Sequence, residues 1–301
     1  MLSALAPVFF LILMGYVLMA WGFPGTPFWG YVERSTYYIF FPALLLDTLG
    51  EAELVGQNAL PMLGAILLSI LVLAGLLLAI RPVTRFSGPA FSSVFQGGLR
   101  MNSFVGLAGV SALLGGQGLA LAGVALMGMI PLLNLLCVSA VVGFSGTGRP
   151  RPAQLCLEVV KNPLILACVA GFGLNQLPFV LPEAVLRIFD LLGRAALPLG
   201  LLAVGSGLRV RSVTSYAGAI AVSSLFKLLL YPCLTALWCL LFGVTGPALT
   251  VAVLFSGLPT ATSSYILARQ LGGDKELMAA AITLQTALSA LTLPLVLHIW
   301  T

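Results

Sequence analysis

Long apolar stretches alternate with short polar connections along the whole chain. The apolar stretches fall at residues 3–21, 32–49, 59–80, 90–114, 118–144, 157–176, 185–207, 216–242, 247–269 and 275–298. A helix that crosses a bilayer needs about 20 mostly apolar residues. The pattern therefore predicts an all-α integral membrane protein with ten transmembrane helices. We interpret the first stretch as a span and not as a signal peptide, because no basic region precedes it.

Composition supports this class and excludes a soluble one. The chain has 301 residues, of which 60% are hydrophobic and 8% charged, and its mean hydropathy is +1.10. A soluble domain carries about 25% charged residues, so we expect lipid to cover much of this surface. The net charge of +5 comes from basic residues that lie singly or in pairs between apolar runs. They indicate topology and not a nucleic-acid partner.

The polar connection that joins the fifth and sixth stretches divides the chain into two halves. It predicts a first five-helix repeat over residues 1–145, a cytoplasmic connection over 146–156 and a second five-helix repeat over 157–301. Several residues recur at nearly constant spacing, as expected for a repeat. The pairs are Pro7 and Pro163, Gly15 and Gly171, Phe23 and Phe179, and Pro42 and Pro198, all 156 residues apart.

Basic residues in the short loops predict the orientation in the membrane, because cytoplasmic loops are enriched in lysine and arginine. With the N-terminus outside, the inner loops contain Arg34, Arg81, Arg85, Arg149, Arg151, Lys161, Arg209, Arg211, Arg269 and Lys275, and the outer loops contain Arg187. We therefore expect both termini outside. An odd number of helices in each half inserts the second half upside down relative to the first, which gives a 5+5 inverted repeat.

Two near-copies interrupt the fourth and ninth stretches. They are Phe104–Ala108 and Phe255–Pro259. Broken helices at matching positions of two halves indicate the binding site of a transporter. In the fourth stretch we expect Gly106 and Gly109 to let the helix unwind, one turn after Asn102. The alternative is that the glycines allow close packing and Asn102 makes an interhelical hydrogen bond.

In the ninth stretch Pro259 removes a backbone donor and suits the first position of a new half-helix. Hydroxyl side chains follow it directly. The positive N-terminus of such a half-helix favours a carboxylate or another anion; a simple proline kink is the alternative. The predicted substrate-binding residues are Asn102, Ser103, Gly106, Ala108, Gly257, Pro259, Thr260, Thr262 and Ser263.

Several charged residues lie inside the apolar stretches, and four of them are candidates for a role there. Lys227 is near the middle of the eighth and Arg100 is about ten residues into the fourth. Charges at this depth usually face an interior or a cavity, so both are candidate charge partners of an anionic substrate. Snorkelling to the membrane surface is the alternative for Lys227. Asp190 and Arg194 are four residues apart, which predicts an ion pair on one helix face.

The sequence lacks the motifs of several enzyme classes. It has no Gly-Lys-Ser or Gly-Lys-Thr of a P-loop, and its single histidine, His298, lies at the C-terminal end. Its five cysteines have no C-x-x-C spacing and suit apolar packing better than a metal site. Paired intramembrane carboxylates are missing too. We therefore expect no catalysis, no cofactor and no metal, and energy from a gradient or from another subunit.

Several motifs resemble the auxin efflux carrier family, whose bacterial members include malonate-type carriers. The matching segments are Phe41–Leu46, Asn102–Leu107, Asp190–Gly205, Lys227–Pro232, and Leu258–Ala261 with Leu271–Asp274. They keep the family's order over nearly the whole chain. One departure concerns the fourth stretch, where the family usually has proline after Gly-Leu and this chain has Ala108. The first break then depends on Gly106 and Gly109 alone.

The resemblance implies a fold and a mechanism. Helices 1, 2, 6 and 7, counted in chain order, would form a scaffold that dimerises. Helices 3–5 and 8–10 would form a moving transport domain, with the substrate held where broken helices 4 and 9 cross. The implied activity is elevator-type transport of small organic anions in the cytoplasmic (inner) membrane of a bacterium. The coupling ion is left open between a proton and sodium, and a sodium-coupled symporter of the bile-acid type is the alternative function.

Overall fold

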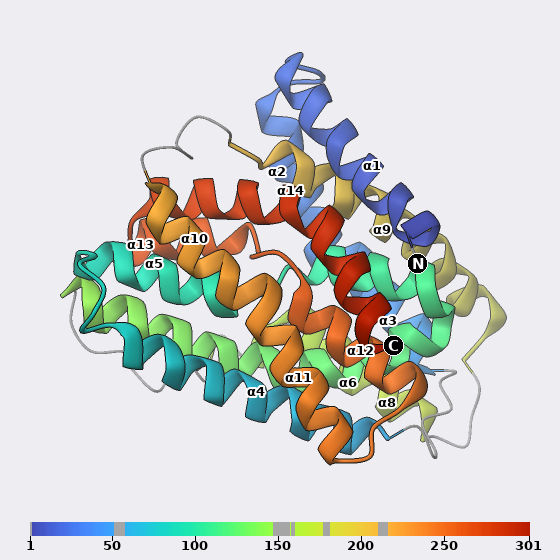
Figure 1. The fold of residues 1–301 in the computed structure, drawn as a ribbon. Coiled ribbons are helices and arrows are strands. Elements are labelled where there is room, and N and C mark those ends of the chain that lie inside the picture. Colours follow the sequence, from blue (N-terminus) through green and yellow to red (C-terminus); the bar gives the residue numbers. More distant parts are fainter. Residues whose placement is uncertain (1, 51–57, 147–156, 158–159, 177–180, 210–215) are drawn as a thin grey trace.

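The computed structural model describes residues 2–50, 58–146, 157, 160–176, 181–209 and 216–301, and in this part of the chain every regular element is helical (Figure 1). Six of its helical stretches are long and apolar enough to cross a membrane. The predicted class, an all-helical integral membrane protein, is therefore confirmed. The count of ten spans and the inverted repeat stay predictions, and the connection at 147–156 lies outside the described residues.

The helices of the first half follow the apolar stretches closely. They are α1 (Leu2–Ala20), α2 (Thr26–Ser35), η1 (Thr36–Phe40), α3 (Phe41–Gly50), α4 (Ala59–Ile80), α5 (Gly88–Leu99) and α6 (Ser103–Ser145). The elements α2, η1 and α3 form one continuous helical stretch. Helix α6 bends sharply at Gly115, which has φ 57° and ψ −140°. Glycine adopts this backbone conformation without strain, and the bend falls between the fourth and fifth predicted spans.

The described residues of the second half are also organised as helices. Its helices are α8 (Pro163–Asn175), α9 (Glu183–Ser206), α10 (Ala217–Leu225), η3 (Phe226–Leu230), α11 (Tyr231–Leu241), α12 (Gly246–Gly257), α13 (Ser263–Leu271) and α14 (Lys275–Trp300). On α9, Nε of Arg194 lies 2.8 Å from Oδ1 of Asp190, so the predicted ion pair is confirmed.

The short elements η1 and η3 are wide helical turns, and a proline explains each one. Pro42 and Pro232 follow them by two residues. Proline has no N–H for the carbonyl four residues earlier, and its ring clashes with that carbonyl. The chain widens by one residue instead, so that the N–H of Phe41 bonds to the carbonyl of Thr36 and the N–H of Tyr231 to that of Phe226. Such wide turns are rare and occur often at functional sites.

The helices pack in two groups. Helix α9 contacts α1, α3, α2 and η1, and α3 also contacts α8. The backbones of α1 and α9 touch, because a Cβ on Gly15 or Gly205 would collide with carbonyl oxygens of the facing helix (Figure 1). Helices α4, α5, α6 and α10–α14 form the second group, and α6 also borders the first.

Candidate functional site

Two extended segments cross in the second group of helices. The first joins α5 to α6, and its first residue, Arg100, has φ −65° and ψ 144°. The second joins α12 to α13, and its first residue, Leu258, has φ −64° and ψ 150°. The backbone N–H of Asn102 donates to the carbonyl of Pro259 at 2.9 Å. The two interruptions are therefore bonded directly to each other.

The predicted position of the first interruption is wrong. The helix does not unwind at Gly106 and Gly109, which lie in regular helix in α6. It is interrupted earlier, because Oδ1 of Asn102 accepts the N–H groups of Phe104 at 3.1 Å and Val105 at 3.3 Å and so starts a new helix at Ser103. Ala108 lies beyond the interruption, inside this helix, so the expected dependence on Gly106 and Gly109 is wrong too.

The near-copies in the sequence are consequently not structural equivalents. Leu258 lies in the second interruption, whereas the matching residue of the first copy, Leu107, lies in helix. Gly106 has a packing role: a Cβ there would lie 2.7 Å from Cδ1 of Leu258, which belongs to the other interruption. Its lack of a side chain lets the two crossing segments approach.

The expected role of Pro259 as the first residue of a half-helix is also wrong. Helix α13 begins four residues later, at Ser263, with Thr262 before it. The residue before a proline is disfavoured in helical conformation, which keeps Leu258 extended. Gly257 is the last residue of α12. The predicted hydroxyl groups still gather at the start of α13, on Thr262, Ser263 and Ser264.

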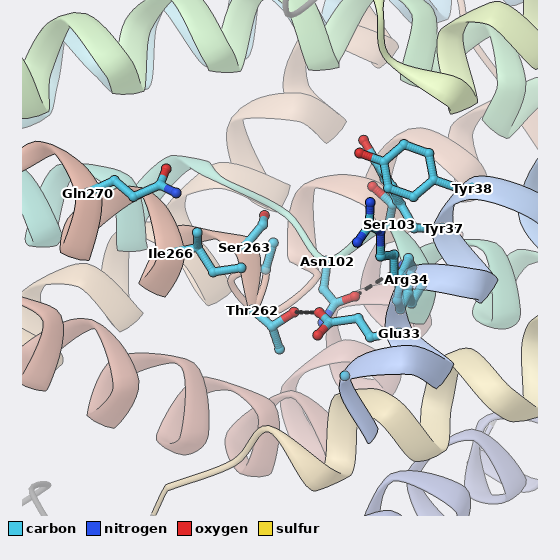
Figure 2. Close-up of a pocket in the computed structure, with 13 residues that line it drawn as sticks. Glu33, Arg34, Tyr37, Tyr38, Asn102, Ser103, Thr262, Ser263, Ile266 and Gln270 are labelled. Carbon is cyan, nitrogen blue, oxygen red and sulfur yellow. Dashed lines mark hydrogen bonds between the residues drawn. The ribbon is translucent and has the colours of Figure 1, made fainter. Parts of the chain in front are cut away.

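A cavity of about 700 Å³ lies beside the crossing and is lined by residues of four elements. Figure 2 shows side chains from α2 and η1, from the start of α6 and from α13 around one space. The lining residues are Gly30, Glu33, Arg34, Tyr37, Tyr38, Asn102, Ser103, Phe104, Ala261, Thr262, Ser263, Ile266 and Gln270. Of the predicted site residues, the cavity therefore brings together Asn102, Ser103, Thr262 and Ser263.

Positive charge borders the cavity at several places, and one carboxylate, that of Glu33, lines it as well. The N-termini of α6 and α13 both border it, and the N-terminus of a helix carries partial positive charge. Asn102 already accepts the N–H groups of Phe104 and Val105 at the start of α6, and the N–H groups of Ser264 and Tyr265 in α13 bond to the carbonyls of Ala261 and Thr262. Arg34 adds a full positive charge, and its guanidinium carbon lies 5.9 Å from the centre of the Tyr38 ring. Asn102 is buried, and its amide nitrogen has no hydrogen-bond partner within the described residues.

The sequence of the second half matches a known family. Residues 148–297 match the family model described as membrane transport protein. This chain belongs to that family. The match confirms the resemblance to the auxin efflux carrier family, and it makes this protein a membrane transporter and not an enzyme.

Two curated relatives are similar to this transporter. A protein of Rhizobium meliloti (strain 1021) with the name "Putative malonate transporter" is 30% identical over 198 residues, which cover 61% of this chain and 62% of the relative. The chain thus aligns with less than two thirds of that protein. An "Uncharacterized transporter" of Methanothermobacter thermautotrophicus is 27% identical over 298 residues, which cover 96% of this chain and 94% of the relative.

The side-chain amide of Gln285 connects the second interruption of the transporter to the end of α5, just before the first interruption. Gln285 of α14 is fully buried, and its Oε1 accepts the N–H of Thr260 at 3.1 Å. Its Nε2 donates to the carbonyl of Gly97, near the end of α5, at 3.0 Å. The hydroxyl of Thr260 lies 2.9 Å from the same carbonyl. Gln285 was not predicted; its one signal in the sequence is an amide in the middle of an apolar span.

Lys227 lies away from the cavity. Its side chain is fully buried, so it does not snorkel. Nζ donates to the carbonyl of Ser256 at 2.9 Å and lies 4.3 Å from the centre of the Tyr231 ring. Ser256 is the second-last residue of α12, whose last carbonyls lack intrahelical donors. Lys227 therefore caps the negative end of α12.

Arg100 lines a different cavity, of about 160 Å³, which shares Tyr37, Ser103, Ala261 and Ser263 with the larger one. Tyr37, Asn134 and Asn162 line it as well, and Nδ2 of Asn162 donates to the hydroxyl of Tyr37 at 3.0 Å. The structure thus does not bring Arg100 or Lys227 to the larger cavity. The charged residues that it does place there are Glu33 and Arg34. Neither was predicted as a site residue, and Arg34 was interpreted as a topology signal.

Proposed function

We propose that this transporter carries small carboxylate anions of the malonate class and binds them in the 700 Å³ cavity. The observation that carries the proposal is the convergence of two helix N-termini and Arg34 on one space. One carboxylate group would bind Arg34, as a guanidinium pairs well with a carboxylate. A second would lie at the N-termini of α6 and α13, within reach of Asn102 and Ser263. The name of the Rhizobium relative supports this class of substrate.

We propose an elevator-type mechanism for the transport step. The first group of helices, with α2 and η1, would be the scaffold, and α4–α6 with α10–α14 would be the transport domain. The two groups of contacts described above support this division. The cavity lies between α2 of the scaffold and the crossing in the transport domain. A sliding of one group past the other would therefore carry an anion bound at the crossing.

The proposal places the chain in a bacterial cytoplasmic membrane, with both termini outside and the two five-helix repeats inserted in opposite orientations. In this proposal the protein forms a homodimer through the scaffold helices. The ten basic residues of the inner loops support the orientation. Cysteine labelling from outside in spheroplasts tests it, at a single cysteine introduced near either terminus of a variant whose five native cysteines are replaced by serine or alanine. Protection of both positions would contradict the predicted topology.

Transport itself is tested with purified protein in liposomes. We expect radiolabelled malonate to enter vesicles preloaded with unlabelled malonate, and unlabelled small dicarboxylates to compete. Arg34→Gln should reduce this counterflow strongly. Arg187→Gln is the matched control, because Arg187 is exposed, its Nη1 lies 4.0 Å from Oε1 of Glu183, and it does not line the 700 Å³ cavity. Failure of every small carboxylate to exchange or compete would refute the proposed substrate class.

A further inference from the structure

The smaller cavity, of about 160 Å³, adjoins the larger one at the crossing. Tyr37, Ser103, Ala261 and Ser263 line both cavities. Ser103 is the first residue of α6 and Ser263 is the first residue of α13, and Figure 2 shows both side chains at the larger cavity. The two cavities therefore meet at the two helix N-termini, where the proposed function places the second carboxylate of malonate.

The two cavities differ in charge. The larger one is lined by Arg34 and also by the carboxylate of Glu33. The smaller one is lined by Arg100, and none of its described lining residues is acidic. No ion pair between described residues includes Arg100. Its guanidinium interacts with the buried thiol of Cys137, and because a guanidinium has five N–H groups, donors remain for an anion.

A hydroxyl donor also lines the smaller cavity. Asn162 precedes α8, and its Oδ1 accepts the N–H groups of Leu164 at 3.0 Å and Ile165 at 3.2 Å. These bonds orient the amide, so that Nδ2 donates to the hydroxyl of Tyr37 at 3.0 Å. Since that hydroxyl accepts from Asn162, its own hydrogen can be donated to an anion. Apolar side chains suited to methylene groups complete the lining: Met101, Ile130, Leu133, Leu164 and Ala261.

We propose that the smaller cavity is a second subsite of this transporter and binds the far carboxylate of dicarboxylates longer than malonate. This inference rests on the proposed function, because the near carboxylate binds in the larger cavity. The methylene chain then extends past Ser103 and Ser263, and the far carboxylate pairs with the guanidinium of Arg100. A water molecule occupies about 30 Å³, so a cavity of about 160 Å³ accommodates a carboxylate and an adjoining methylene group.

Chain length decides which substrates use this subsite. Malonate has one methylene group between its carboxylates, so malonate bound to Arg34 ends at the two helix N-termini. Each further methylene group brings the far carboxylate closer to Arg100. Arg100 directly follows α5 and thus belongs to the helices that would carry the anion. Its charge would therefore move with the far carboxylate, whereas Tyr37 and Asn162 would stay with the scaffold.

The test compares dicarboxylates of increasing length with monocarboxylates of the same length. Purified protein in detergent is titrated by calorimetry with malonate, succinate, glutarate and adipate, and with the matching monocarboxylates, at a pH where every carboxyl group is ionised. For the wild type we expect at least one dicarboxylate longer than malonate to bind roughly 10- to 100-fold more tightly than its matching monocarboxylate, because the far carboxylate gains a charge-assisted hydrogen bond.

Variants of Arg100 connect this preference to the smaller cavity. Arg100→Gln should lower the ratio of the affinity for the longer dicarboxylate to the affinity for malonate by roughly 10- to 100-fold. Arg100→Lys keeps the charge but loses the planar fork of the guanidinium, so it should retain part of the ratio. Arg187→Gln is the matched control, since Arg187 lines neither cavity, and it should leave the ratio unchanged. Thermal unfolding in detergent shows that each variant is folded.

Two results overturn the inference while the proposed function stands. One is an unchanged affinity ratio in Arg100→Gln, because a merely structural role of Arg100 would weaken the binding of all dicarboxylates alike. The other is a wild type that binds malonate but binds no longer dicarboxylate better than its matching monocarboxylate. Should Arg100→Gln fail to fold, Arg100→Lys decides, and a ratio equal to that of the wild type overturns the inference. If no small carboxylate binds the wild type, the proposed function fails, and the inference fails with it.

Discussion

Asn102 combines two roles that substitutions can separate. Its Oδ1 caps α6, and its amide nitrogen is an unused donor at the cavity. Alanine removes both roles. Serine and aspartate are as good as asparagine at the N-cap position, but neither has the amide donor, and aspartate adds a negative charge where an anion would bind.

The two roles have different magnitudes. Loss of an N-cap costs about 1 kcal/mol of stability, which is small against the roughly 5–15 kcal/mol of a folded domain. Loss of a hydrogen bond to a charged group costs about 1.5–3 kcal/mol of binding free energy. This corresponds to a roughly 10- to 150-fold weaker affinity. Aspartate adds repulsion to this loss and should bind most weakly.

The order of the variants is therefore different for the two properties. For thermal stability in detergent we expect wild type, Asn102→Ser and Asn102→Asp to be similar and Asn102→Ala to be lowest. For malonate affinity, measured by calorimetry and by counterflow, we expect the wild type to be highest, serine and alanine lower, and aspartate lowest. Asn134→Ala is the control, since Asn134 lines the smaller cavity.

One result refutes the reasoning. If Asn102 acts only as a helix cap, affinity follows stability, and Asn102→Asp binds and transports malonate as the wild type does. That outcome would remove Asn102 from the binding site and return it to the alternative drawn from the sequence, a purely structural residue.

Three further predictions concern residues around the crossing. Arg34→Gln should weaken malonate binding by roughly 10- to 100-fold, because it removes a charge-assisted hydrogen bond; equal affinity in calorimetry would exclude Arg34 as the charge partner. Lys227→Met should leave malonate affinity within about twofold, because Lys227 contacts Ser256 and not the cavity; a large loss would restore it as a charge partner. Gly106→Val should destabilise the fold by about 1–3 kcal/mol through overpacking against Leu258, measured by thermal unfolding. Gly143→Val in the same helix has open space around its Cβ and should be nearly neutral, and equal effects of the two would contradict the packing role.

The sequence predicts the helices well, because apolar length alone defines a membrane span. It also predicts that the fourth and ninth spans are interrupted, since glycine, proline and hydroxyl residues are unusual there. It misplaces the first interruption because the near-copies suggested equivalence. The better local signal was Asn102 itself, whose side chain is typical of a helix start.

The residues that complete the cavity are harder to predict. Glu33 and Arg34 have the pattern of ordinary loop charges, and only the folded protein places them opposite α13. Gln285 belongs to no motif in the sequence. Its role depends on the carbonyl of Gly97 and the N–H of Thr260, which the interruptions leave free. Tertiary packing, and not local preference, decides these positions.

The polar contacts at the crossing are distributed unevenly, and this bears on which parts of the transporter would move together. The two interruptions are joined by the bond from Asn102 to Pro259 and by the bonds of Gln285 to Thr260 and Gly97. Separating them would leave several buried polar groups without partners, each at a cost of about 1–3 kcal/mol. A polar contact from the crossing to α2 is the hydrogen bond between Thr262 and Glu33, and both of these residues line cavities. A sliding motion would therefore break this contact first and carry both interruptions past α2 as one body.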